Sequence, residues 1–158
     1  MSRRKAREVI LCMIFERDYH KDKSHADMYA HFLNNGNIDE IYHSLIYKDQ
    51  NDLNDQSDDA KEKTSLDYNY IEKTFCGVFD NIDQLDSIIS ESSISWSNNR
   101  ISKISLALLR LATYEMIYAD DVPASAAINE AVELSKKYDS EDAYTFINGV
   151  LGAIEKSL

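Results

Sequence analysis

A cluster of basic residues opens the chain and could bind phosphate: Arg3, Arg4, Lys5 and Arg7 all lie in its first eight residues. At 100° per residue, the three arginines fall within an arc of about 100° on a helix. Phe15 lies on the same side of that helix as Arg4. Basic groups bind phosphates and aromatic faces stack on bases, so the pattern predicts a surface for single-stranded nucleic acid.

A solvated role for these cations is the alternative. The N-terminus of a helix carries partial positive charge, so a cation in the first turn destabilises the helix by about 0.3 kcal/mol or more. Stability alone would not place arginines there. On the residues alone, a binding surface and a charged stretch that keeps the helix soluble both stay open.

Other chemistry is not indicated by the motifs. The histidines have no recognised metal-ligand spacing to cysteines or acids, so we expect surface histidines rather than a metal site; they are His20, His25, His31 and His43. The four glycines are too scattered for a phosphate-binding loop. Neither a Gly-x-Ser-x-Gly elbow nor a His-Glu-x-x-His motif occurs. We therefore predict no catalysis, no cofactor and no metal.

The elements that must position the basic cluster are helices. Apolar residues at Ala6, Val9, Ile10, Met13 and Ile14 follow helical spacing, which predicts a first helix over about 3–19. The same reasoning predicts further helices over about 25–33, 38–47, 66–90 and 101–118, the fourth being either one long helix or two joined near residue 80.

Helix-boundary residues organise the last third of the chain. Pro123 suits the first position of the helix that follows it, and Ser140 is a credible N-cap for the last helix. Gly149 lies inside that last helix, where a glycine costs about 1 kcal/mol relative to alanine. We expect another backbone to approach it closely. Trp96 lies in a polar stretch that suits a connecting turn.

Length and composition indicate one all-α domain. The chain has 158 residues, 44% of them apolar and 28% charged, which is typical of a globular protein. A single proline and four glycines favour long helices over a strand-rich fold. Cys12 and Cys76 are lone thiols with no signal peptide before them, and no run approaches the roughly 20 apolar residues of a membrane span. We expect a cytoplasmic protein with no membrane contact.

Charge is unevenly distributed along the chain. The net charge of −11 argues against nonspecific binding to a polyanion, yet most of the acidity lies beyond the first helix. The segment 49–64 is acidic and polar, which predicts an exposed loop or a disordered insertion. It lacks the glycine and glutamate positions of a calcium-binding loop, so we do not expect calcium there.

Several motifs together resemble the NusB family of bacterial transcription antitermination factors. Besides the basic start, they are Leu109-Arg110-Leu111-Ala112-Thr113-Tyr114-Glu115, Val122-Pro123, Ala127-Ile128-Asn129-Glu130-Ala131, Ser140-Glu141-Asp142 and Phe146-Ile147-Asn148-Gly149-Val150-Leu151. The resemblance covers roughly the first fifteen residues and then 101–154. It implies a helical bundle of about seven helices in two helical subdomains, about 1–90 and 91–158.

The resemblance also implies a function and a site. Proteins of this family bind the boxA element of ribosomal RNA leader transcripts together with ribosomal protein S10 (NusE), and so make RNA polymerase, with other Nus factors, read through terminators. By position, Arg3, Arg4 and Arg7 match the arginine-rich start that contacts RNA. Tyr138, Asp142 and Phe146 match the second part of that surface, although Tyr138 and Phe146 could instead belong to the core.

The chain also departs from the family pattern. Ser105 and Leu106 replace the usual acid and base before the Leu-Arg-Leu run, where NusE is expected to bind. Ser125 and Thr145 replace basic residues, and Thr145 removes an expected phosphate contact. We therefore predict weaker RNA binding and a flatter salt dependence than in basic relatives.

Two other functions stay open. One is a NusB-like ribosomal-RNA-binding module with no antitermination role. The other is a helical scaffold that binds a protein through its acidic face. Oligomeric state is open as well, because a basic helix is equally compatible with a monomer and with a homodimer that masks it.

Overall fold

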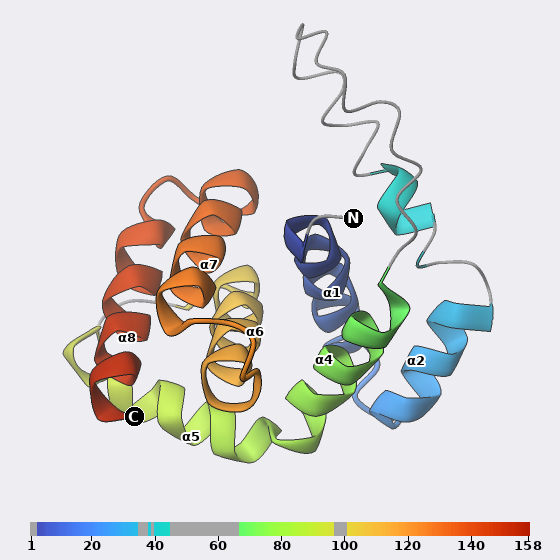
Figure 1. Ribbon diagram of the computed structural model, residues 1–158, viewed down its shortest axis with the longest axis horizontal. Coiled ribbons are helices and arrows are strands. Elements are labelled where there is room, and N and C mark those ends of the chain that lie inside the picture. Colours follow the sequence, from blue (N-terminus) through green and yellow to red (C-terminus); the bar gives the residue numbers. More distant parts are fainter. Residues whose placement is uncertain (1–2, 35–37, 39, 45–66, 97–100) are drawn as a thin grey trace, which may run out of the picture. The chain divides into compact units, whose positions relative to one another are not determined.

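The computed structural model describes residues 3–34, 38, 40–44, 67–96 and 101–158, and in these ranges every regular element is helical (Figure 1). The predicted all-α class is thereby confirmed. The acidic segment 49–64 lies outside the described residues. The chain divides into two compact units, Met1–Phe75 and Cys76–Leu158.

The first unit contains α1 (Arg3–Arg17), α2 (His25–Asn34), a short helical stretch at 40–44 and the start of α4 (Tyr68–Asp80). Ser24 caps α2, because its hydroxyl accepts a hydrogen bond from the Asp27 N–H at 3.1 Å. In the core of the unit, the rings of Phe32 and Phe75 meet edge to face with centroids 6.2 Å apart. The predicted helices 3–19 and 25–33 therefore occur with ends shifted by one or two residues.

α1 is buried over a wider arc than the predicted stripe. Ala6, Val9, Ile10, Met13 and Ile14 are all fully buried, as their helical spacing predicts. The buried side chains also include those on the part of the helix surface next to this stripe, which are Arg7, Glu8 and Leu11. This helix is therefore enclosed on most sides, and only its first residues are exposed.

The predicted helix over 66–90 is two helices, α4 and α5 (Ile82–Ser92), as one of the two alternatives anticipated. Asn81 separates them, because its side-chain amide donates to the Gly77 carbonyl at 2.8 Å and so satisfies an end of α4. α5 packs against α6 and α8. The boundary between the two compact units, at Phe75 and Cys76, lies inside α4. The division into helical subdomains near residue 90 that the family resemblance implies stays a prediction.

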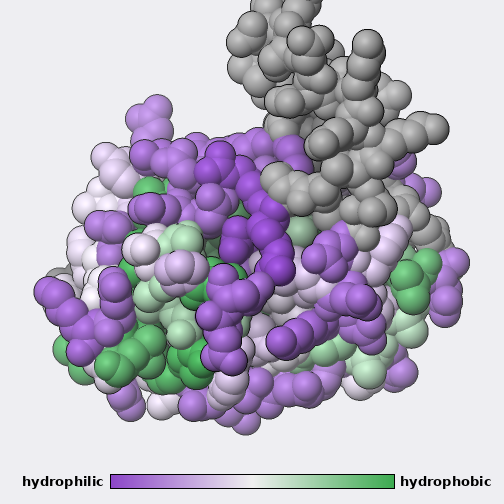
Figure 2. Space-filling view, viewed as in Figure 1, coloured by the Kyte–Doolittle hydropathy of each residue, from purple (hydrophilic) through white to green (hydrophobic). Residues whose placement is uncertain are grey.

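In the second unit, α6 (Lys103–Tyr118) packs against α7 (Ala124–Tyr138) and α8 (Ala143–Ser157), which also pack on each other. α6 is mostly buried, as its nearly continuous apolar run predicts. Ser102 caps it by accepting a hydrogen bond from the Ser105 N–H at 3.0 Å. The face of the molecule in Figure 2 is largely hydrophilic, with smaller hydrophobic areas between the polar side chains.

The boundary residues of α7 and α8 differ from their predictions. Pro123 is the N-cap of α7, one residue before the predicted position. The prediction that Ser140 caps α8 is wrong: Asp142 holds that position, and its side chain makes no cap hydrogen bond. The reason is a turn in which the Ala143 N–H donates to the Ser140 carbonyl at 3.1 Å, which delays the start of the helix.

Gly149 does meet a close neighbour, but the neighbour is a side chain rather than a backbone. A Cβ atom at Gly149 would lie 2.8 Å from Cζ2 of Trp96. Trp96 belongs to a short 3-10 helix, η2 (Ile94–Trp96), and its ring also meets Phe146 edge to face at 5.5 Å between centroids. The glycine therefore makes room for the indole that covers α8.

Candidate nucleic-acid interface

The first turn of α1 presents two exposed arginines, Arg3 and Arg4. The guanidinium carbon of Arg3 lies 4.1 Å from the centroid of the Tyr70 ring, within the range of a cation–π contact. Tyr70 is fixed at the start of α4, where its N–H donates to the Asp67 carboxylate at 3.1 Å. An arginine that stacks on a tyrosine can still donate from the edge of its guanidinium plane, which suits phosphate binding.

The other two basic residues of the cluster are less available. Lys5 Nζ lies 3.6 Å from a carboxylate oxygen of Glu8, and the Glu8 side chain is almost fully buried. Arg7 is only 7% exposed. On the helix, Arg7 lies 40° from Arg3 toward Leu11, inside the arc that is buried along most of α1. The structure therefore separates a predicted cluster of four cations into two exposed ones, one partly exposed and one buried.

Phe15 is half-buried near the other end of α1. Its ring meets the exposed ring of Tyr19 edge to face, with centroids 5.6 Å apart. Because a helix rises 1.5 Å per residue, Phe15 lies roughly 18 Å along the axis from Arg3. The predicted basic and aromatic parts of this surface are thus too far apart to hold one nucleotide.

A second group of cationic and aromatic side chains surrounds the connection from α7 to α8. Lys137 Nζ lies 5.3 Å from the centroid of the Tyr138 ring, and Lys136 Nζ lies 5.2 Å from that of Tyr144. Lys136 also lies 3.4 Å from a carboxylate oxygen of Glu133 on the same helix. Tyr138 is half-buried, whereas Tyr144 is 42% exposed.

The two other predicted contacts in this region differ in exposure. Asp142 is exposed, and its carboxylate accepts no capping hydrogen bond from α8. Phe146 is only 8% exposed, with its ring against Trp96. Phe146 adjoins Ile147, which is fully buried, so the inward side of α8 extends to both positions. Asp142 can accept a hydrogen bond from a base, whereas Phe146 offers little ring surface to a ligand.

Asp139 ties the end of α7 to the start of α6. Its carboxylate accepts hydrogen bonds from the hydroxyls of Ser102 and Ser105, and from the Ser140 N–H at 2.8 Å. Burial acts to raise the pKa of the Asp139 carboxyl, but these hydrogen bonds outweigh burial and hold that pKa below its ordinary value. Ser105, a departure from the family pattern, is therefore part of the contact that fixes one end of the α7–α8 connection.

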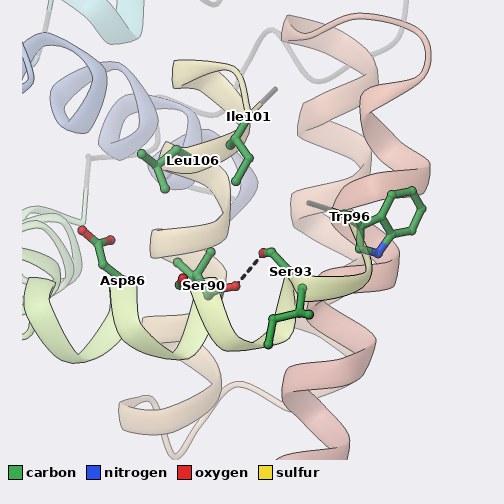
Figure 3. A pocket seen from close by; sticks show the side chains of 8 residues that line it. Asp86, Ser90, Ser93, Trp96, Ile101 and Leu106 are labelled. Atoms are coloured by element: carbon green, nitrogen blue, oxygen red, sulfur yellow. Dashed lines mark hydrogen bonds between the residues drawn. The ribbon is translucent and has the colours of Figure 1, made fainter. Parts of the chain in front are cut away.

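A pocket of about 410 Å³ lies beside α5 and the start of α6 (Figure 3). Its lining is mostly apolar and consists of Asp86, Ile89, Ser90, Ser93, Ile94, Trp96, Ile101 and Leu106. Asp86 is engaged there by Arg110, whose Nε and terminal nitrogen donate to its two carboxylate oxygens at 2.8 and 2.9 Å. Among the described residues that line the pocket, Asp86 is the one titratable side chain.

Within the ranges that the structure describes, no group of three or more His, Cys, Asp or Glu side chains is arranged to hold a metal ion. Among the described helices, none combines the length and apolar character that crossing a membrane requires.

Three residues that the sequence analysis did not single out lie beside basic or aromatic side chains: Tyr70 contacts Arg3 in the first unit, and Lys136 contacts Tyr144 in the second. Tyr70 is separated from Arg3 by more than sixty positions, so no local pattern could connect them. Lys136 lies in the last turn of α7, where a cation is favoured by the helix C-terminus alone, so its residue type does not indicate a binding role. The exposure of Tyr144 could have been predicted, because Tyr144 lies two positions before Phe146 and must face nearly the opposite side of the helix.

Comparison with known proteins identifies relatives along nearly the whole chain. The NusB family model matches residues 4–156. Transcription antitermination protein NusB of Clostridium acetobutylicum is 36% identical over 157 residues, which cover 99% of this chain and 97% of that protein. The NusB protein of Acetivibrio thermocellus is 38% identical over 156 residues, or 99% and 90% of the two chains.

Solved structures of NusB proteins have the same fold. A structure of T. maritima NusB superposes with a TM-score of 0.67 at 26% identity, covering 99% of this chain and 92% of the other. A crystal structure of antitermination factors NusB and NusE in complex with dsRNA gives a TM-score of 0.65 at 22% identity, with 99% and 97% covered. The latter likeness supports the fold alone.

Proposed function

The chain belongs to the NusB family, and we propose that it is an RNA-binding transcription antitermination factor. In this proposal it binds boxA of ribosomal RNA leader transcripts together with ribosomal protein S10 (NusE), and promotes read-through by RNA polymerase with other Nus factors. The observation that carries the proposal is the similarity to NusB proteins over 99% of the chain. The protein acts by binding in the cytoplasm and performs no catalysis.

The start of α1 supplies the phosphate contacts in this proposal. Arg3 and Arg4 are exposed and contact the RNA backbone directly, with Lys5 at the edge of the same surface. The stacking of Arg3 on Tyr70 restricts the guanidinium before RNA arrives, which lowers the entropy lost on binding. Arg7 is buried, so we assign it to supporting this turn rather than to direct contact.

Aromatic and acidic groups supply the contacts to bases. Phe15, at the edge of α1, and Tyr138, at the end of α7, are each half-buried and present part of a ring. Asp142 accepts hydrogen bonds from base amino or imino groups, since its carboxylate is exposed and does not cap α8. Phe146 holds Trp96 in place and thereby positions this end of α8.

The test is the salt dependence of binding to a boxA-containing RNA by wild-type protein and by Arg4→Gln. Each phosphate contact to single-stranded RNA contributes a slope of about −0.7 to the plot of log K against log salt. Arg4→Gln should flatten the slope by about that amount. Lys23→Gln is the matched control, because Lys23 is an exposed cation of the same unit that we place outside the surface. Equal slopes for all three proteins would contradict the assignment of Arg4.

A further inference from the structure

We propose that Lys136 and Tyr144 form a nucleotide subsite for single-stranded RNA, in which the Tyr144 ring stacks on a base and the Lys136 ammonium binds the adjacent phosphate. The inference rests on the proposed RNA-binding function and adds two residues to it. Both side chains belong to the second unit, and they are brought together by the connection between α7 and α8.

Exposure distinguishes Tyr144 from the other aromatic residue of α8. Tyr144 is 42% exposed, whereas Phe146 is 8% exposed and packs against Trp96. Two residues along a helix correspond to a rotation of about 200°, so one ring faces the core and the other faces solvent. A base can therefore stack on Tyr144 without any rearrangement of the core.

Lys136 lies close enough to the Tyr144 ring to bind the phosphate of a nucleotide stacked on that ring. Lys136 Nζ lies over one face of the Tyr144 ring, 5.2 Å from its centroid, so a base stacks on the opposite face and its adjacent phosphate meets the ammonium at the edge of the ring. A lysine has three donor hydrogens, and here it contacts the ring and a carboxylate oxygen of Glu133 at 3.4 Å. Both side chains of this ion pair are about half exposed, at 50% and 52%, so a phosphate can replace the carboxylate at little cost.

The neighbouring acids argue for a specific contact rather than a general attraction of polyanions. The connection carries Asp139, Glu141 and Asp142, so its overall charge does not attract RNA. The Asp139 carboxylate accepts hydrogen bonds from Ser102 and Ser105, which partly satisfies its charge. Binding at this place therefore depends on ring stacking together with individual cations, and Lys136 beside Tyr144 provides both.

The experiment measures the affinity of the full chain for a single-stranded boxA-containing RNA at several salt concentrations. Tyr144→Ala should weaken binding by about 5- to 150-fold, the range expected for loss of one stacked base, without a change of salt slope. Tyr144→Phe keeps the ring and should bind within about twofold of wild type, a smaller change than loss of a stacked base would give.

Charge variants of α7 separate the phosphate contact from stacking. Lys136→Gln should flatten the salt slope by about 0.7, and Glu133→Gln should tighten binding because it removes the carboxylate that competes with phosphate. Lys156→Gln is the matched control, an exposed lysine near the far end of α8 that should leave the slope unchanged.

The outcomes distinguish failure of the subsite from failure of the proposed function. If wild type binds and Arg4→Gln flattens the slope but Tyr144→Ala binds as tightly as wild type, the subsite is overturned while the function stands. If Tyr144→Phe is as weak as Tyr144→Ala, stacking is refuted, since the ring is retained. If wild type binds no RNA, both the proposed function and the subsite fail. Circular dichroism of each variant establishes that the helices are retained.

Discussion

Replacing Gly77 by alanine should destabilise the second unit, because the phenol of Tyr114 occupies the space of the missing side chain. A Cβ atom at Gly77 would overlap the hydroxyl end of Tyr114 and lie 2.6 Å from its Cε2 atom, about 1 Å inside normal contact. Tyr114 is 6% exposed and cannot swing into solvent. Overpacking of this kind costs about 1–3 kcal/mol, while alanine recovers about 0.5–1 kcal/mol of helix propensity, so we expect a net loss of up to about 2.5 kcal/mol.

Urea unfolding followed by Trp96 fluorescence measures this loss, since Trp96 is the sole tryptophan and lies in the same unit as Gly77. Gly152→Ala is the matched control: it is also inside a helix, but its Cβ atom would meet nothing within 4 Å. That variant should be stabilised by about 0.5–1 kcal/mol.

A double-mutant cycle with Tyr114→Leu isolates the steric contact. In the Tyr114→Leu background, the ring is absent, so Gly77→Ala should become neutral or stabilising. If Gly77→Ala instead stabilises the wild-type background as much as the Tyr114→Leu background, the close approach of the two helices at Gly77 is refuted.

Four further predictions follow from single contacts. Asp139→Asn should reduce the stability that the protein loses in acid. The depressed pKa of the Asp139 carboxyl stabilises the fold at pH values above the ordinary aspartate pKa of about 3.9, and this contribution disappears as the pH falls through the pKa in the folded state. Urea unfolding at several pH values measures the difference. Arg110→Lys should lose about 1 kcal/mol with the paired hydrogen bonds to Asp86, and should lose less in an Asp86→Asn background. Thr145→Lys should restore a phosphate contact and steepen the RNA salt slope by about 0.7. Phe146→Ala should destabilise the fold by about 3–5 kcal/mol and shift Trp96 emission, whereas unchanged stability would contradict its burial.

Periodicity predicted the helices well because their apolar positions repeat strongly. Both ends of α1, α2 and α6 lie within two residues of the bounds predicted for them. The break at Asn81 was anticipated only as an alternative, since the deciding interaction is a side-chain hydrogen bond to Gly77 that no propensity encodes. Ser140 was assigned as a cap from residue type alone, and residue type does not reveal the turn, closed by the Ala143 N–H and the Ser140 carbonyl, that moves the cap to Asp142.

The candidate site was less predictable than the fold. Residue types indicated which side chains could bind RNA, but burial decided which of them are available, and burial depends on neighbours far along the chain. Arg7 and Phe146 were assigned by type and position, yet both are largely buried. The pairing of Lys136 with Tyr144 could not be read from the sequence, because it depends on how the α7–α8 connection turns.

The most direct test of the proposed function is the affinity for boxA RNA with and without purified NusE, measured at several salt concentrations. We predict salt-sensitive binding that NusE strengthens, and by linkage the RNA must strengthen NusE binding by the same factor. RNA binding that NusE leaves unchanged would instead favour a ribosomal-RNA-binding module without an antitermination role. Absence of RNA binding under both conditions would contradict the central claim, and would favour the acidic face as a protein-binding surface.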